Sequence, residues 1–432
     1  MMKKYIIFQF LLIPLISIAQ LQLSLHSSID TALQNSFDIR IERNNVEISK
    51  INNSFGVAGG LPSLNASAGG DKYQYNISQE TGTDSVKDEY KINGTSLNAD
   101  ISASMVLYNG SKIIAAKKRL GLLQKQSEII LNRQIQNTVA GVMIKYYDIV
   151  RQESYLKIIR NTLDVSREKM KIIQEKDNVG MASAVDILQA KTDVRLAEQD
   201  LKLQESIVAM AKTDLLLVID AKSLIGFEVD GNISVDSSLT LDMILNNLNN
   251  NPGYLESEQH VMISEQSLKE ISAQRYPSVR VNAAYTISRS DNDAGSVLMN
   301  RNYGPSAGLS LQVPIFNGFI YKSQKSVAEL NLSNSKLQKE NLLNSLYFQA
   351  FNLYQSYSTA IHQIVSQQKN YEMSKQLVDL VMQNFQVNQA TILDVKAAQT
   401  SLENASNLLI NLKYTSKIAE IELKELIYKL EY

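Results

Sequence analysis

Apolar residues follow a heptad rhythm in two segments, 187–218 and 395–430. In the first segment the apolar positions advance in alternating steps of three and four, and only Gln204 departs from the pattern. The second segment repeats these steps from Val395 to Leu430. A period of 3.5 predicts helices that pack in left-handed coiled coils. The apolar positions form the seam along which such helices meet, and the many alanines on this seam predict that the helices approach each other closely.

Four other segments alternate apolar and polar residues with a period of two, which predicts β-strands. The expected strands cover 61–75, 96–108, 277–288 and 303–316. Each is close to the 9–11 residues that cross a membrane, and the alternation fits the wall of a water-filled barrel. A soluble sheet with one wet face would show the same alternation. The polar stretches 76–94 and 289–302 are expected to be hairpin loops.

The chain contains two copies of one domain-sized unit. The segment "VLYNGSKI" at 106–113 is echoed by "PIFNGFIY" at 314–321, and Asp186 is echoed by Asp394. From the glycine of each Asn-Gly pair to the aspartate, the spacing is 76 residues in both copies. This agreement indicates internal duplication, with a period too long for a solenoid repeat. Each unit is expected to hold a first helix, two strands, a long helix, a sharp turn and a return helix.

The expected boundaries place two repeats around a polar, glycine-containing linker: 20–220, 221–238 and 239–432. The first repeat is expected to contain helices at 28–55, 111–179 and 186–219, and the second repeat is expected to contain the corresponding helices at 239–272, 320–387 and 392–430. The middle helix of each repeat is long enough to span roughly 100 Å. Each unit is therefore predicted to form a long antiparallel hairpin, with the strands at one end and the turn at the other.

The first nineteen residues differ from the rest in composition. A basic "MMKK" is followed by a short apolar stretch, and Ser17 and Ala19 occupy the small-residue positions that a signal peptidase reads. The apolar stretch is shorter than the about 20 residues that span a membrane. Residues 1–19 are therefore predicted to be a cleaved secretory signal, with a mature chain starting near Gln20. A buried N-terminal helix is the alternative.

Charge and residue usage argue against several classes of protein. The chain has 43 Lys and Arg, 44 Asp and Glu and a net charge of −1, without the basic excess of nucleic-acid binders. It has no cysteine, which excludes a disulfide framework, a thiolate metal site and a cysteine nucleophile. Its three histidines, His26, His260 and His362, lie far apart, and no glycine-rich phosphate loop occurs. We expect no enzymatic activity, cofactor, metal or nucleic-acid partner.

Four strands cannot close a membrane barrel, because their outer edges would leave backbone groups unpaired in lipid. Membrane barrels have at least about eight strands. If these strands enter a membrane, several chains must therefore combine, each supplying four strands.

The signal, the duplication, the strand pairs ending in "YNG" or "FNG" and the hairpin turn "NVGMASAVDILQAKTDV" (178–194) occur together. In this combination the chain resembles the TolC-like outer membrane efflux protein family over essentially all of 20–432. The resemblance implies a mixed fold, in which a membrane β-barrel joins a long α-helical barrel of coiled-coil hairpins.

The resemblance further implies a homotrimer with a twelve-stranded barrel in outer-membrane lipid and a twelve-helix tunnel in the periplasm. Such a trimer is the duct of a tripartite export system, supplied by a periplasmic adaptor and an inner-membrane pump, and it needs no cofactor. A secreted coiled-coil scaffold or adhesion stalk, which the heptads alone would explain, is the alternative.

The resemblance places a gate and a docking surface at the hairpin turns. In the family an aspartate links to a tyrosine and an arginine, and these positions fall on Asp186, Phe385 and Ala390. An acidic ring expected one turn beyond Asp394 falls on Ala397. Because the tyrosine hydroxyl, the arginine and this acidic group are missing, closure is expected to use apolar contacts or different residues. The gate candidates are Val185, Asp186, Phe385, Ala390 and Asp394, and the adaptor-contact candidates are Gly180, Met181, Ala182, Ser183, Asn388 and Gln389.

The turn residues are also expected to cap the helices and to set the backbone conformation of the turns. Asp186 and Asp394 stand at helix starts, where a carboxylate accepts hydrogen bonds from free N–H groups and meets the positive end of the helix dipole. Three copies of Asp186 around an axis would in addition form a ring that attracts cations. Gly180 is expected to adopt a left-handed conformation that ends the first long helix, and Asn388 is expected to replace it in the second copy.

Overall fold

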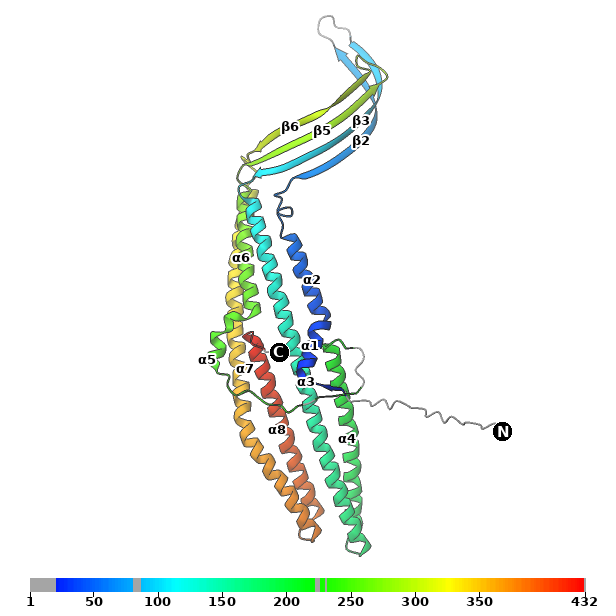
Figure 1. Ribbon diagram of the computed structural model, residues 1–432, viewed down its shortest axis with the longest axis vertical. Coiled ribbons are helices and arrows are strands. Elements are labelled where there is room, and N and C mark those ends of the chain that lie inside the picture. The colour runs from blue at the N-terminus through cyan, green and yellow to red at the C-terminus, as the bar shows by residue number, and fades with distance from the viewer. Residues whose placement is uncertain (1–20, 81–86, 222–225, 230, 431–432) are drawn as a thin grey trace, which may run out of the picture. The chain divides into compact units, whose positions relative to one another are not determined.

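The computed structural model of the chain describes residues 21–80, 87–221, 226–229 and 231–430 (Figure 1). The signal peptide expected at 1–19 lies outside these residues. The described residues form two compact units: those within Met1–Arg40, Ile135–Asn247 and Phe348–Tyr432 make the first, and those within Ile41–Gln134 and Leu248–Tyr347 make the second. The two longest helices contribute to both units.

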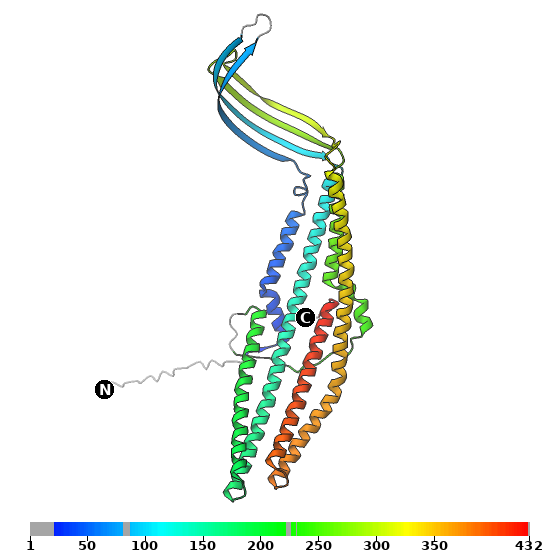
Figure 2. The ribbon, with the colours of Figure 1, turned by 180° about the vertical axis from the view of Figure 1, so that it is seen from behind.

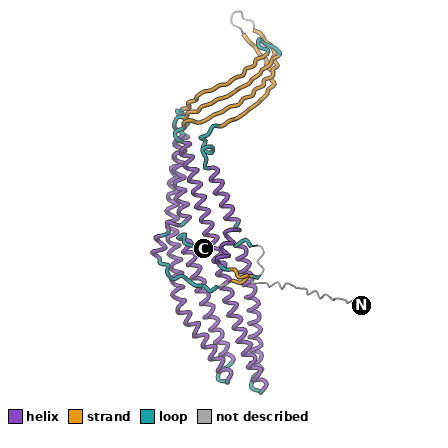
Figure 3. Tube along the Cα trace, viewed as in Figure 1, coloured by secondary structure: helices purple, strands orange, loops and turns teal. Residues whose placement is uncertain are grey.

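Two long helical hairpins repeat with the same dimensions. The first consists of α3 (Lys112–Asn178) and α4 (Ala184–Val218), and the second of α7 (Ile320–Gln386) and α8 (Ile392–Leu426). Each boundary in the second hairpin lies 208 residues after its counterpart in the first. Figure 3 shows the short turns that join the helices of each hairpin. The predicted duplication is therefore confirmed, although α8 ends four residues before the expected 430, where Tyr428 adopts a left-handed conformation.

The buried residues of the return helices follow the predicted heptads. On α8 the seam is buried almost throughout, at Val395, Ala398, Ala405, Leu409, Ser416, Ala419, Leu423 and Leu426. On α4 the buried set includes Ala190, Ala197, Val208, Ala211 and Leu215, together with the exceptional Gln204. The Gln204 amide donates to the backbone oxygen and the side-chain oxygen of Gln152 on α3, both at 3.0 Å. These bonds explain why a polar residue can occupy the seam.

The first helix of each repeat is divided, where a single helix was predicted at 28–55 and at 239–272. The first copy has α1 (Leu25–Asn35) and α2 (Phe37–Asn52), and the second has α5 (Leu241–Asn246), a 3-10 turn (Leu248–Asn250) and α6 (Pro252–Ala273). Capping residues cause the interruptions: Ser36 accepts from the Ile39 N–H at 3.4 Å, and Asn251 accepts from the Gly253 N–H at 2.9 Å. Pro252 also lacks the N–H that a continuous helix would require.

The linker 221–238 contains a short strand that was not predicted. In the first unit, β4 (Phe227–Val229) pairs in parallel with β1 (Leu21–Leu23). Leu23 and Phe227 are both buried in the main apolar cluster of this unit. A three-residue strand is too short to produce a recognisable alternation in the sequence.

The second unit contains one antiparallel sheet in the order β2-β3-β5-β6 (Figure 2). Its strands are Ser63–Glu80, Lys87–Tyr108, Ser278–Asn292 and Met299–Gln312. The pairing of β2 with β3 continues from Asn76 opposite Lys91 to Glu80 opposite Lys87, so the loop predicted at 76–94 was wrong over most of its length. The loop predicted at 289–302 is also shorter than expected, because β5 continues to Asn292 and β6 begins at Met299. The backbone pairs here with an adjacent strand regardless of side-chain alternation.

The two faces of the sheet differ in polarity, as the alternation predicted. Residues opposite each other on paired strands share a face. One such row holds Ala66, Ile101, Tyr285 and Pro305, and the next holds Ala68, Ala99, Ile287 and Tyr303. The rows of the other face hold Asn65, Ser102, Ala284 and Ser306, and Ser67, Asp100, Thr286 and Gly304.

None of the helices in the described part of the chain combines the length and the hydropathy that a bilayer-spanning helix requires.

Candidate functional site at the helical turns

The first hairpin turns through Val179–Ser183 with a glycine in a left-handed conformation. The φ of Gly180 is +73°, as predicted, and the N–H of Met181 donates to the Lys176 carbonyl oxygen at 2.8 Å. Ser183 then caps α4: its side chain accepts from the Asp186 N–H at 3.1 Å, while the Asp186 carboxylate accepts from the Ser183 N–H at 3.3 Å. This reciprocal capping box satisfies two free donors at the start of the helix.

The second turn repeats this construction with different residues. Asn388 takes the left-handed conformation with φ +64°, and the Gln389 N–H donates to the Asn384 carbonyl oxygen at 2.8 Å. Thr391 and Asp394 form the capping box, in which the Asp394 carboxylate accepts from the Thr391 N–H at 2.8 Å. Hydrogen bonds from the Thr391 side chain and backbone hold the pKa of Asp394 below its usual value. Capping therefore accounts for both aspartates, and any gating role is additional.

The adaptor-contact candidates lie mostly on an exposed surface of the turns. Gly180, Met181, Ser183, Asn388 and Gln389 are exposed. Ala182 is instead half-buried and packs against the apolar cluster beneath the turns. Large apolar side chains are exposed around them, at Val179, Met181, Val185, Val387 and Leu393.

The gate candidates fall into two environments. Val185 is exposed, and Asp186 is half-buried within its capping box. Phe385 is only 4 % exposed and belongs to an apolar cluster that joins both hairpins, with Ile173 and Ala190 from the first and Met382 and Val395 from the second. Ala390 packs against the same cluster. The phenylalanine at the family's tyrosine position is thus a core residue of this chain.

Lys176, which was not predicted as a site residue, connects the two hairpins at the turns. From the last turn of α3, its ammonium donates to the Phe385 carbonyl oxygen at 2.7 Å and lies 4.2 Å from the centre of the Phe385 ring. The carbonyl groups at the end of α7 form the negative end of the helix dipole, which favours a cation. Burial lowers the pKa of Lys176, and the negative charge of Asp186 opposes that shift.

A second unpredicted group lies further along the hairpins. The Asp193 carboxylate on α4 accepts from the fully buried Lys169 of α3 at 2.5 Å, and from Lys396 of α8 at 3.1 Å. The Gln189 amide also donates to it, at 2.8 Å. Burial alone would raise the pKa of Asp193, but the hydrogen bonds from Lys169, Lys396 and Gln189 keep it below the usual value.

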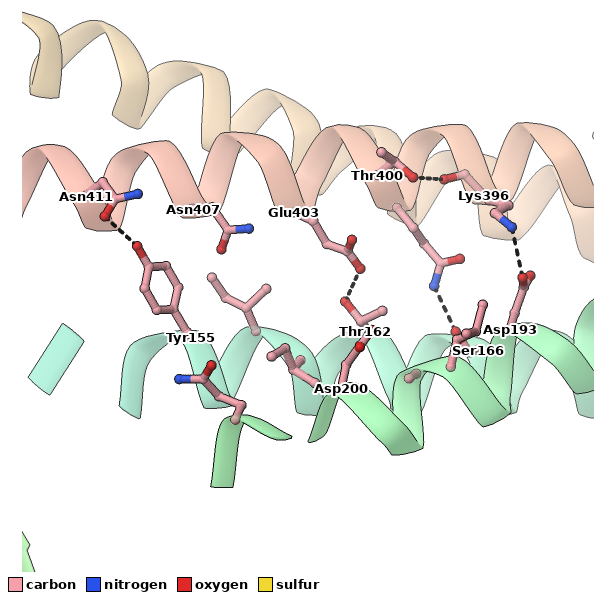
Figure 4. A pocket seen from close by; sticks show the side chains of 16 residues that line it. Tyr155, Thr162, Ser166, Asp193, Asp200, Lys396, Thr400, Glu403, Asn407 and Asn411 are labelled. Atoms are coloured by element: carbon pink, nitrogen blue, oxygen red, sulfur yellow. Dashed lines mark hydrogen bonds and ion pairs between the residues drawn. The ribbon is translucent and has the colours of Figure 1, made fainter. Parts of the chain in front are cut away.

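An open cleft of about 560 Å³ lies beside this group, between α3 and α4 on one side and α8 on the other (Figure 4). Its walls are largely polar, with Thr162, Asp200, Glu403, Asn407 and Asn411 among the lining residues. Within the described chain, no three His, Asp or Glu side chains gather where a metal ion could bind. The arrangement consists of capped turns, apolar contact and paired charges.

Comparison with known proteins identifies the family. The family model for outer membrane efflux proteins matches residues 28–218 and 244–427. The chain belongs to the outer membrane efflux protein family. This confirms the resemblance that the sequence indicated, together with outer-membrane localisation and a transport function that is not enzymatic.

Relatives of this efflux protein match over most of its length. It is 20 % identical over 415 residues to the probable efflux pump outer membrane protein TtgC of Pseudomonas putida, covering 93 % of this chain and 82 % of TtgC. It is 19 % identical over 357 residues to TolC of Escherichia coli, covering 78 % of this chain and 70 % of TolC. A crystal structure of CusC aligns with a TM-score of 0.76 at 16 % identity, covering 94 % of this chain and 92 % of that one. The fold of paired strands and long helical hairpins is thereby confirmed, and the chain is the outer-membrane channel of an efflux pump.

Proposed function

We propose that three copies of this chain form one duct, with a barrel of twelve strands in the outer membrane and a barrel of twelve helices in the periplasm. The sheet carries this proposal. Its outer strands β2 and β6 each have one unpaired edge, and one of its faces is apolar. Edges of this kind are stable in lipid only when another strand pairs with them. Three copies of a four-stranded sheet meet edge to edge and leave no edge open.

The helices support association in the same way. On α4, the exposed apolar residues Leu196, Leu203, Met210 and Leu217 are spaced every seventh position and are 51–79 % exposed. A stripe of this kind is the seam that a coiled-coil neighbour covers. Within the trimer we assign that role to a helix of the next chain.

The exposed apolar residues at the turns support a docking role. We propose that a periplasmic adaptor contacts Gly180, Met181, Ala182, Ser183, Asn388 and Gln389, and that an inner-membrane pump delivers substrate through this junction. The gate lies at the same turns, and its candidates are Val185, Asp186, Phe385, Ala390 and Asp394. The neighbouring exposed side chains of Val179 and Val387 suit contact with another protein, because apolar patches at a turn gain free energy when covered.

Two measurements test this function. Purified protein reconstituted in a planar bilayer is expected to give stepwise ion conductance, and its absence in every preparation would contradict a duct. A photo-crosslinking residue at Met181 is expected to capture an adaptor in cells that produce the whole pump. The same residue at Lys191, exposed on α4 beyond the turn, is the control. Equal capture at both positions would contradict docking at the turns.

A further inference from the structure

The apolar face of the sheet becomes basic at one end. Its last apolar row holds Ala68, Ala99, Ile287 and Tyr303. The next row on the same face holds Gly70, Leu97, Arg289 and Arg301. The row after that holds Lys72, Thr95, Asp291 and Met299. These rows lie at the loop end of the sheet, where β2 connects to β3 and β5 connects to β6, whereas the opposite end leads into α3 and α7.

The row of arginines lies where the surface of a bilayer is expected. On β5, ten residues separate Val279, in the first apolar row, from Arg289. At about 3.4 Å per residue and a strand tilt of about 40°, they rise about 26 Å, which matches the roughly 25 Å tall apolar band of membrane barrels. Among the described strands, the basic residues of this face all lie toward the loop end. Their partner is therefore expected in one leaflet only.

Arg289 and Arg301 occupy directly opposite positions on β5 and β6. Like charges at such positions destabilise the pairing, because their Cβ atoms are only about 5 Å apart. Asp291 compensates one of them, since it accepts from Nε of Arg289 at 2.7 Å and from Nη2 at 3.2 Å. The Arg301 guanidinium instead lies 5.7 Å from the Tyr303 ring centre, and no carboxylate of the described chain forms an ion pair with it. Within the described chain, the pair thus keeps one uncompensated positive charge.

The donors of this arginine pair suit a phosphate group. A guanidinium carries five N–H donors in a planar fork, and Asp291 accepts from two groups of Arg289. Both arginines are exposed, so their other donors face the surroundings of the sheet. Phosphate oxygens accept paired hydrogen bonds from such a fork. Two forks at opposite positions can therefore bind the oxygens of one phosphate.

The sign of the charge indicates from which side the phosphate comes. Near the loop end, the polar face of the sheet carries the carboxylates of Asp71 and Asp100. A soluble anion on that side would be repelled. The basic residues belong to the apolar face, which lies against lipid in a membrane barrel. An anion that reaches the arginine pair is therefore expected to be the headgroup of a lipid.

We propose that Arg289 and Arg301 bind the phosphate group of an anionic lipid in the leaflet at the loop end of the barrel. The adjacent apolar rows would contact the acyl chains of the same lipid. In the proposed duct, β2 of the next chain pairs with β6, which brings Lys72 of the next chain to the same level of the barrel. The inference rests on the proposed duct, because the duct places the apolar face in lipid.

Lipid retention tests the site. Native mass spectrometry of the protein in detergent micelles with added phosphatidic acid counts the bound lipids. We expect one retained phosphatidic acid per chain, and no comparable retention of phosphatidylcholine with the same acyl chains, whose choline group cancels the phosphate charge. Equal retention of both lipids would overturn the proposal. Inorganic phosphate is the third probe, and its retention in place of the lipid would also overturn it.

Substitutions test the arginines. Arg301→Gln is expected to weaken phosphatidic acid binding about fivefold, and the double variant with Arg289→Gln about 25-fold. Arg301→Lys keeps the charge and is expected to lose less than Arg301→Gln. Arg280→Gln is the matched control, because Arg280 is exposed on β5 but belongs to the polar face. Wild-type binding in the double variant, or an equal loss in the control, would overturn the site.

The single variant keeps the test usable if the double variant does not fold, because no hydrogen bond within the described chain involves the Arg301 side chain. The same spectra separate this site from the duct. A monomer that retains one phosphatidic acid would overturn the duct and leave the arginine pair supported. A trimer that retains none would overturn the site alone.

Discussion

The turn residues show how far single positions determine their own structure. A left-handed conformation at Gly180 and Asn388, and a carboxylate three residues after Ser183 or Thr391, depend only on neighbours within one turn of helix. These features were therefore predictable from the sequence. The positions of Lys176 and Asp193 were not, because their environment comes from helices far away in sequence.

Asp186 caps α4 and is proposed to place a charge in the pore, and two substitutions separate these roles. Asp186→Asn removes the charge and keeps an oxygen that can accept in the capping box, whereas Asp186→Ala removes both. We expect both variants to weaken cation preference in planar bilayers. Only the alanine variant is expected to lose about 1 kcal/mol of local helix stability, measured as faster hydrogen exchange in the first turn of α4.

The corresponding substitutions at Asp394 provide the comparison, since its capping box has the same design. Unchanged selectivity in both Asp186 variants would dismiss a charged ring at this position and leave capping as its whole role.

Glu425 gives the protein a pH dependence that its composition does not suggest. Burial, followed by the nearby charge of Glu422, raises the pKa of Glu425 to about 6. The folded protein then holds this proton more tightly than the unfolded chain, so stability decreases as the pH rises through the interval from 4.5 to about 6. The free energy of unfolding lost over this interval is on the order of 1 kcal/mol. It is smaller than the pKa shift alone would give, because solvent screens the charge of the partly exposed side chain.

Thermal unfolding at several pH values measures this contribution. Glu425→Gln is expected to raise the melting temperature above wild type at pH values above 6 and to leave it unchanged near pH 4.5. Glu175→Gln, on the exposed surface of α3, is the control and is expected to match wild type throughout. A Glu425→Gln protein with the wild-type pH profile would contradict the assignment.

At the scale of whole elements, periodicity predicted the type of each long segment better than its ends. The heptads predicted the two hairpins, because helix packing imposes that period on the buried face. The first helices were predicted without their interruptions, since the capping roles of Ser36 and Asn251 depend on a few local hydrogen bonds. The sheet extends beyond its alternating segments, because strand pairing needs only backbone groups.

The exposed stripe on α4 makes a prediction about assembly. Replacing Leu203 and Met210 together with glutamate puts two charges on the seam that we assign to a neighbouring chain. We expect folded protein with normal helical circular dichroism but without trimers, as measured by light scattering after size exclusion. Gln199→Glu, exposed on the same helix, is the control. Trimers that persist in the double variant would place the chain contact elsewhere.

At the scale of the whole molecule, duplication lets one chain supply four strands and two long hairpins to the proposed duct. Two copies of the unit give two strand pairs of different lengths, and two hairpins whose boundaries match. The family membership makes this chain an outer membrane efflux protein, and the open edges of its sheet support the proposal that other chains pair with it. Counting the strands in the sequence led to the expectation of several chains, and the proposed number of three comes from the resemblance to the family.

The number of chains in the assembly is the most direct test of the proposed duct. Native mass spectrometry of protein extracted from outer membranes in detergent, and released from the micelle in the gas phase, counts the chains without further assumptions. The account predicts a single species of three chains that persists at low protein concentration. A monomer or a dimer under the same conditions would contradict a duct closed by three four-stranded sheets.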